Sequence, residues 1–274
     1  MKLREALAAA VGKLSSVSDT PRLDAELLAA HALGTTRNDL LLKHLEGSAP
    51  EGFDSLVARR LTSEPIAYIT ERRDFWTLSL AVRPGVLIPR PDSETLIEAA
   101  LAHFVDRQPQ SILDLGTGSG ALLLAALMEF SGAKGLGIDQ ARDAITIAEE
   151  NAVTCQLASR AEFRLGNWAE GLRGSFDLIL CNPPYIRTDA DLPEAVVAFE
   201  PSGALFAGPE GLDDYRVLAP QIARLLAPSG CAVMEIGFDQ AVSVGTMFEG
   251  AGLSVEVWKD LGGRDRCLRL TKSL

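Results

Sequence analysis

Apolar side chains recur at helical spacing through the first 62 residues of the chain. A helix over residues 2–14 carries its apolar residues on one face: Leu3, Ala6, Leu7, Ala10 and Leu14. Pro21 suits the first position of a second helix, and Gly34 suits its end. Two more short helices are predicted over residues 37–44 and 52–62. The pattern indicates a small amino-terminal helical bundle whose core is marginal for its size.

The pattern changes between residues 75 and 89. Apolar residues alternate with polar ones at Trp76, Leu78, Leu80 and Val82, which is typical of a strand with one buried face. The Pro84–Gly85 pair that follows is a turn signal. These residues predict a β-hairpin, with its turn at Pro84–Gly85, between the bundle and the rest of the chain.

From residue 111 onward, short apolar runs alternate with helical patterns. Strands are predicted over residues 111–116, 134–139, 161–167, 176–182, 231–237, 253–260 and 266–271, and helices over residues 119–130, 141–153, 213–226 and 240–251. Apolar strands that alternate with helices indicate a mostly parallel sheet covered on both faces. The last two strands are joined too tightly, through Gly262–Gly263, for a crossover, so one of them is expected to run antiparallel.

Charge divides the chain in a similar way. The chain has 26 basic and 37 acidic residues, a formal net charge of −11. Residues 1–75 hold 10 of the basic and 11 of the acidic side chains, so nearly all of the acidic excess lies in the second part. Because acidic surfaces repel phosphate backbones and anionic lipids, direct binding of nucleic acid or of a membrane is not expected.

Cysteine and histidine do not suggest a metal site. Four cysteines, Cys155, Cys181, Cys231 and Cys267, are far apart, and the chain has only three histidines. We therefore expect no metal, and we interpret the cysteines as unpaired thiols of a reducing compartment. The longest apolar run, residues 121–128, is too short to span a bilayer. These features predict a soluble cytoplasmic protein.

A glycine-rich loop follows the first strand of the alternating part. It reads Asp114-Leu-Gly-Thr-Gly-Ser-Gly120 and leads into a helix. Glycines there let backbone amides approach a ligand at the carboxyl edge of the sheet. Asp139 ends the next strand, where a carboxylate can accept both hydroxyls of a ribose. Together the loop and the acid indicate a nucleoside site.

Details of the loop discriminate between nucleoside cofactors. Dinucleotide-binding loops read G-x-G-x-x-G and hold a pyrophosphate, whereas this loop reads G-x-G-x-G after Asp114, which would repel a phosphate. An acid there suits an ammonium group, which favours S-adenosylmethionine over a nicotinamide cofactor. After the third strand, Asn167 can pair with a base edge and Trp168 can pack against an adenine ring.

The fourth strand runs directly into Asn182-Pro183-Pro184-Tyr185. The Asn182 side-chain oxygen and the Pro183 carbonyl are two acceptors that can hold both N–H bonds of a planar amino group. Its lone pair, which is otherwise delocalised, would then face a methyl donor. The two prolines fix the backbone, and Tyr185 can pack on the flat face of the target. The motif therefore predicts methylation of a planar nitrogen, in which Asn182, Pro183 and Tyr185 are catalytic and Asn182 to Tyr185 hold the substrate.

The glycine loop followed by Cys181-Asn-Pro-Pro-Tyr185 resembles the class I methyltransferases that act on exocyclic or amide nitrogens. Over nearly its whole length, the chain is similar to the HemK/PrmC family, which methylates the Gly-Gly-Gln glutamine of peptide chain release factors. The segments that carry the similarity are residues 64–69, 86–94, 199–201, 204–205, 211–212 and 235–237, together with Asp260 and Arg266. The resemblance implies a Rossmann-like α/β domain over residues 91–274, a hairpin linker over 74–90, and a bundle over 1–73 that recognises the release factor.

The same resemblance assigns the cofactor and the contacts to it. S-adenosylmethionine would be converted to S-adenosylhomocysteine, without metal. The residues expected to bind it, from the motif and from the resemblance together, are Asp114, Gly116, Thr117, Gly118, Ser119, Gly120, Asp139, Asn167, Trp168 and Asn182. One departure is Asn167, because the family often has Asp at this position, although an amide can still accept from the adenine amino group.

Three alternative functions share part of this pattern. A sister family methylates a glutamine of a ribosomal protein, but it tends to differ at Arg90-Pro91-Asp92 and at Phe199-Glu200-Pro201. A DNA adenine methyltransferase would share the motif, but it needs a basic face on which to flip a base. A non-catalytic binding module would be expected to have lost the glycine loop or Asn182, and the chain retains both.

Overall fold

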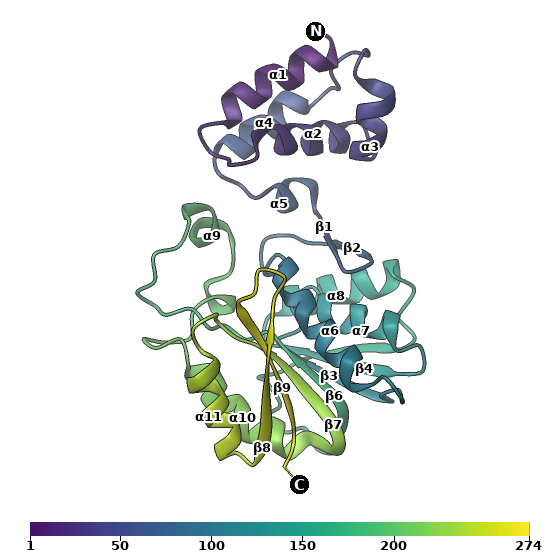
Figure 1. Cartoon of the computed structure of the whole chain (residues 1–274). Helices are drawn as coiled ribbons and strands as arrows, with labels where there is room; N and C mark the ends of the chain where they lie inside the picture. Colours follow the sequence, from purple (N-terminus) through teal and green to yellow (C-terminus); the bar gives the residue numbers. More distant parts are fainter. Residues whose placement is uncertain (274) are drawn as a thin grey trace. The chain divides into compact units, whose positions relative to one another are not determined.

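The structure, a computed structural model that describes residues 1–273, contains two compact units (Figure 1). One unit comprises residues 1–72 and 192–199, and the other comprises residues 73–191 and the chain from residue 200 onward. The segment 192–199 thus belongs with the helical unit, although the alternating part surrounds it in the sequence.

The first unit is helical. Its elements are α1 (Leu3–Leu14), α2 (Pro21–Ala32), α3 (Arg37–Asp39), the π-helical turn η1 (Leu40–His44), α4 (Phe53–Leu61), α5 (Ile66–Thr70) and α9 (Glu194–Phe199). The apolar positions that predict helices form its core, in which Leu3 and Leu14 of α1 pack with Leu28 of α2 and Phe53 of α4. The four predicted helices are confirmed. The short helices α5 and α9 are too brief to give a periodic signal.

The hairpin is present, but its turn lies elsewhere than predicted. Strands β1 (Arg72–Phe75) and β2 (Leu78–Ala81) are joined at Trp76–Thr77, and Pro84–Gly85 comes after the hairpin. Trp76 has a positive φ of 55°. Its backbone N–H donates to Glu94 Oε1 at 2.8 Å, and its ring Nε1 donates to Glu129 Oε1 at 2.6 Å. These two tertiary bonds hold a turn that contains no glycine.

The second unit is built on a seven-stranded sheet. In spatial order its strands are β5 (Ala161–Leu165), β4 (Lys134–Asp139), β3 (Ser111–Leu115), β6 (Phe176–Cys181), β7 (Leu226–Glu235), β9 (Asp265–Lys272) and β8 (Leu253–Lys259). The first five are parallel, and β9 is antiparallel to both β7 and β8. The predicted mostly parallel sheet with an antiparallel closing strand is confirmed.

Helices cover both faces of this sheet (Figure 1). On one face lie α6 (Glu94–His103), α7 (Ala121–Glu129) and α8 (Arg142–Thr154), and on the other lie α10 (Asp213–Leu225) and α11 (Ala241–Gly250). Successive residues of β3 serve opposite cores, since Ile112 packs under α6 and α7 while Leu113 packs under α10 and α11. Among the described residues, no helix combines the length and apolar character needed to cross a membrane.

The strand order reverses beside β3, because the chain runs outward through β4 and β5 and then returns to β6. In open α/β sheets such a reversal opens a crevice at the carboxyl ends of the strands, where ligands bind. The loops after β3, β4, β5 and β6 therefore meet at one edge.

Candidate functional site

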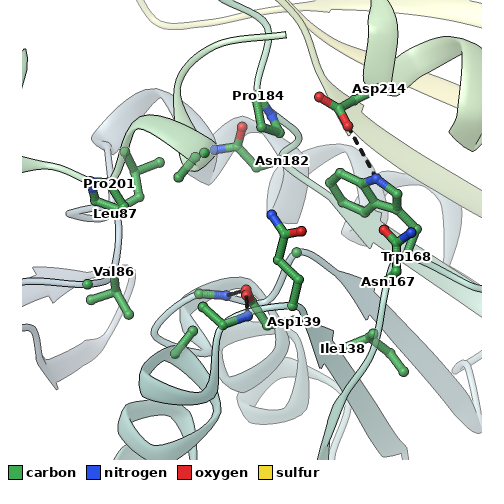
Figure 2. A pocket seen from close by; sticks show the side chains of 18 of the residues that line it. Val86, Leu87, Ile138, Asp139, Asn167, Trp168, Asn182, Pro184, Pro201 and Asp214 are labelled. Atoms are coloured by element: carbon green, nitrogen blue, oxygen red, sulfur yellow. Dashed lines mark hydrogen bonds between the residues drawn. The ribbon is translucent and has the colours of Figure 1, made fainter.

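A cavity of about 260 Å³ lies at this carboxyl edge (Figure 2). Several of the residues predicted from the sequence line it: Gly116, Gly118, Asp139, Asn167, Trp168, Asn182 and Pro184. Val86, Leu87 and Pro201 face Trp168 and Asn167 across the cavity (Figure 2). The other predicted residues do not line it: Asp114, Thr117, Ser119, Gly120, Pro183 and Tyr185. Four strand ends thus converge on a single cavity.

Asp139, at the end of β4, is held by backbone donors. Its Oδ2 accepts the Gly118 N–H and its Oδ1 accepts the Ala141 N–H, both at 2.9 Å. A carboxylate oxygen has two lone-pair directions, so each oxygen keeps one for a ligand hydroxyl. The carboxylate is therefore fixed in orientation and still able to accept hydrogen bonds from a diol.

Trp168 packs against the glycine loop. A Cβ placed on Gly116 would lie 3.0 Å from the Trp168 ring, and Gly116 has a φ of +75°. Both facts require glycine there. The Trp168 Nε1 donates to Asp214 Oδ1 at 3.2 Å, which fixes the ring (Figure 2). Burial raises the pKa of Asp214, although the bond from Trp168 opposes this effect.

Asp114 lies beneath the loop and is fully buried. Its Oδ2 accepts the Thr117 hydroxyl at 2.6 Å, whereas its Oδ1 lacks a partner at hydrogen-bond distance among the described residues. Burial raises the pKa of Asp114 to about 7, and the neighbouring Asp139 adds to this effect, while the Thr117 bond opposes it. Behind the cavity lining there is therefore a buried carboxyl group that is only partly ionised at neutral pH.

The raised pKa of Asp114 makes stability depend on pH. The folded-state value of about 7 exceeds the ordinary 3.8, so folding takes up a proton between these pH values. The contribution of Asp114 to stability is then complete at low pH and is lost as the pH rises through about 7. Asp114→Asn is expected to raise the free energy of unfolding at pH 8 by on the order of 2 to 4 kcal/mol, with little effect near pH 4. Urea titrations of the wild type and of Asp114→Asn between pH 4 and pH 8 measure this difference in the free energy of unfolding. A difference that is the same at every pH contradicts the prediction.

The Asn182–Tyr185 motif begins directly after β6. Asn182 is partly exposed and lines the cavity, and its Nδ2 donates to Ser93 Oγ at 3.1 Å. Tyr185 donates its hydroxyl to Glu235 Oε1 at 3.1 Å. The backbone carbonyl of Tyr185 accepts from Gln240 Nε2, and it packs so closely on Gly211 that a Cβ there would lie 2.3 Å from it. The motif is therefore anchored by residues from three distant parts of the chain.

Several residues around the cavity were not predicted from the sequence. Gln140 and Asp214 line it, while Ser93 and Glu235 hold the motif. Gln140 follows Asp139 at the end of β4, and Glu235 ends β7. Both positions at strand ends could have predicted from the sequence that these residues lie at the carboxyl edge. Ser93 and Asp214 lie near helix starts and carried no such signal. Within residues 1–273, no cluster of metal-ligating side chains is present.

Comparison with protein families gives two matches. Residues 5–70 match the PrmC N-terminal domain, and residues 92–201 match the methyltransferase small domain. The chain is 46% identical over 256 residues to the release factor glutamine methyltransferase of Rhodospirillum rubrum, covering 91% of this chain and 78% of that protein. It is 40% identical over 276 residues to the enzyme of the same name from Moorella thermoacetica, covering 97% of each.

Solved structures share the fold at lower identity. A methyltransferase from Pyrococcus furiosus has a TM-score of 0.54 at 20% identity, covering 79% of this chain and 98% of that one. The Thermus thermophilus 16S rRNA N2 G1207 methyltransferase, solved with AdoMet and guanosine, also has a TM-score of 0.54, at 19% identity, covering 84% of this chain and 54% of that one. These likenesses establish the Rossmann-like methyltransferase fold.

Proposed function

The chain belongs to the family of release factor glutamine methyltransferases, and from this we propose that it methylates the side-chain amide nitrogen of the glutamine in the Gly-Gly-Gln motif of peptide chain release factors. S-adenosylmethionine is the methyl donor and S-adenosylhomocysteine the product. The observation that carries the proposal is that Asp139 and Asn182, one suited to a ribose and the other to an amide, line the same cavity.

The residues around the cavity fit S-adenosylmethionine. The glycine loop leaves room for a ligand, since a Cβ on Gly118 would meet nothing within 4 Å. We propose that Asp139 accepts the ribose hydroxyls, and that Asn167 and Trp168 contact the adenine. Asp114, whose Oδ1 is without a partner within residues 1–273, lies behind the loop, and a bound cation would favour the ionised form of its carboxyl group. When bound, the donor supplies a methyl group on a positively charged sulfur.

The side chain of Asn182 and the carbonyl of Pro183 receive the substrate amide. An amide nitrogen is a poor nucleophile because its lone pair is delocalised into the carbonyl. Two acceptors that hold its N–H bonds orient the nitrogen, and Tyr185 covers the flat face of the amide and excludes water. Catalysis then comes from positioning and from fixed dipoles, which require no reorganisation during the reaction. No residue is needed as a strong base, since an N-methylated amide loses its extra proton readily to water.

We further propose that the helical unit recognises the release factor and that the hairpin segment, residues 74–90, links it to the catalytic domain. The match of residues 5–70 to the PrmC N-terminal domain supports this division. Such a protein acts in the cytoplasm, where release factors work, and it needs neither a metal nor a direct contact with nucleic acid. The net charge of −11 supports the last point, because it disfavours a phosphate backbone.

Mass spectrometry of candidate acceptors tests the substrate. The purified protein is incubated with S-adenosylmethionine and an unmethylated release factor, and in parallel with ribosomal protein and with duplex DNA. We expect one added methyl group on the Gly-Gly-Gln glutamine and none on the other acceptors. Methylation of ribosomal protein or of DNA, with an unmodified release factor, would retain the amide-receptor chemistry and overturn the choice of substrate.

Asp139→Ala is expected to weaken S-adenosylmethionine binding by about 1 to 3 kcal/mol, because hydrogen bonds that involve a charged group are lost. Isothermal titration calorimetry measures the change. Asp139→Asn is the matched variant, since it keeps one oxygen acceptor and should lose less affinity. An unchanged affinity in Asp139→Ala contradicts the assignment of the ribose to this carboxylate.

A further inference from the structure

The amide of Asn182 can face the cavity in two ways. Its oxygen and nitrogen ends have nearly the same size and shape, so packing alone does not choose between them, and the hydrogen-bond partners decide. In the proposed reaction only the oxygen end is useful, because the substrate amide presents N–H bonds. An NH₂ group turned toward the substrate would repel them. The side chain therefore needs a device that fixes its orientation.

Ser93 and Glu235 form such a device behind the motif. The Asn182 Nδ2 donates to Ser93 Oγ at 3.1 Å, and the Ser93 hydroxyl donates to Glu235 Oε2 at 2.5 Å. A serine hydroxyl has one proton to donate, and here it is donated in the hydrogen bond to Glu235. Ser93 can then only accept from Asn182, so the NH₂ end of the amide must face Ser93. The Oδ1 end, which has no hydrogen-bond partner among residues 1–273, is left for a ligand.

Glu235 is placed to act as an acceptor only. It is 1% exposed, and its second oxygen, Oε1, accepts the Tyr185 hydroxyl. Burial raises the pKa of Glu235 to about 6, and the nearby Asp92 also raises it. The hydrogen bonds from Ser93 and Tyr185 and the charge of Arg266 lower the pKa and so limit the rise. The carboxyl group is therefore mainly ionised at neutral pH. Tyr215, from α10, donates to the backbone carbonyl of Glu235 at 2.9 Å and fixes the end of β7.

We propose that Ser93 and Glu235 are positioning residues that set the orientation of the Asn182 amide and of the Tyr185 ring, so that the motif presents an acceptor to the substrate. The proposal rests on the proposed amide methylation and deepens it. Neither residue touches the reacting atoms. They act through Asn182 and Tyr185, from the 3₁₀ turn Pro91–Ser93 before α6 and from the end of β7.

Three variants at Ser93 and Glu235 have distinct expected results. Ser93→Ala frees the amide to rotate and is expected to lower kcat by about 10- to 100-fold, with the Kd for S-adenosylmethionine changed less than twofold. Ser93→Thr restores the hydroxyl and should recover most of kcat. In Glu235→Gln, the new NH₂ can donate to Ser93, which reverses the chain of donors and turns the Asn182 NH₂ toward the cavity, so kcat falls again.

Thr95→Ala is the matched control. Thr95 is equally buried two residues away on α6, and its side chain has no hydrogen bond to the motif. It should keep kcat within twofold of the wild type. The proposal is overturned if Ser93→Ala keeps the wild-type kcat, if Thr95→Ala loses as much, or if Ser93→Ala loses cofactor affinity in parallel with kcat. The last result would mean a general disturbance of the site.

A second readout separates this proposal from the proposed function. The side-chain NH₂ signals of Asn182 in ¹⁵N–¹H spectra are identified by their loss in Asn182→Ala. They should shift in Ser93→Ala and in Glu235→Gln but not in Thr95→Ala. If the wild-type protein does not methylate release factor but the variants show these shifts, the proposed function is overturned. The proposed orientation of the Asn182 amide then still holds. Unshifted signals would overturn the device, whatever the activity.

Discussion

Asn182→Ala is expected to reduce methyl transfer to a release factor by roughly 10²- to 10³-fold or more, the loss typical of removing one preorganised polar group from an active site. S-adenosylmethionine binding should largely survive. Alanine removes the side-chain acceptor and leaves the Pro183 carbonyl as the one remaining partner for the substrate N–H bonds. The substrate nitrogen can then rotate so that its lone pair no longer faces the methyl donor. The loss should appear in kcat, because the interaction matters most during transfer.

Single-turnover mass spectrometry measures the transfer, and calorimetry measures the cofactor affinity of the same preparation. Asn182→Asp is the informative companion variant. It keeps an oxygen in place but loses the NH₂ group that donates to Ser93, so its activity should lie between wild type and alanine. Near-normal turnover in Asn182→Ala would contradict the amide-receptor argument. A parallel loss of cofactor binding would assign Asn182 to the donor instead of the acceptor.

The sheet could be predicted from the sequence because its strands are short apolar runs between glycine-rich or polar segments. Residues such as Ile112 and Leu113 are buried on opposite faces, so no alternation was needed to recognise β3. The hairpin turn could not be placed in the same way. Its position at Trp76 depends on bonds to Glu94 and Glu129, which lie 18 and 53 residues further along the chain.

The residues of the candidate site also fall into a group that local motifs identify and a group that only tertiary contacts place. Residues in local motifs, such as Asp139 and Asn182, reach the cavity because each follows directly after a parallel strand. Tertiary packing brings in Ser93, Glu235 and Asp214. Ser93, for example, lies 89 residues before Asn182 in the sequence. A single sequence contains no spacing rule for such contacts. Apart from Gln140, which follows Asp139 at the end of β4, the missed residues are those that hold and orient the side chains that the motifs identify.

Arg60→Ala is expected to destabilise the helical unit by about 3 to 5 kcal/mol, the usual cost of leaving a buried charge without its partner. The Arg60 Nε donates to Asp24 Oδ2 at 2.8 Å, and both side chains are largely buried. The guanidinium also donates to the backbone carbonyls of Val17 and Glu64. Removing the guanidinium leaves the Asp24 carboxylate without a cationic partner, with only the Thr20 hydroxyl at 3.5 Å, and leaves two carbonyls without this donor. In a unit with a small core, a few kcal/mol is a large share of the stability.

The consequence for function follows from the separation of the cores. The apolar cluster of the helical unit is made entirely of residues from 3 to 69, whereas both clusters of the catalytic unit begin at residue 75 or later. Calorimetry of Arg60→Ala should therefore show an early transition, with S-adenosylmethionine affinity retained and kcat/KM for release factor reduced. Arg22→Ala is the control: its side chain is 81% exposed and its partner Glu26 keeps Arg37, so it should cost less than about 1 kcal/mol. Equal unfolding profiles for the two variants contradict the role of the buried pair. An unchanged kcat/KM once the helical unit has unfolded contradicts its role in recognising the substrate.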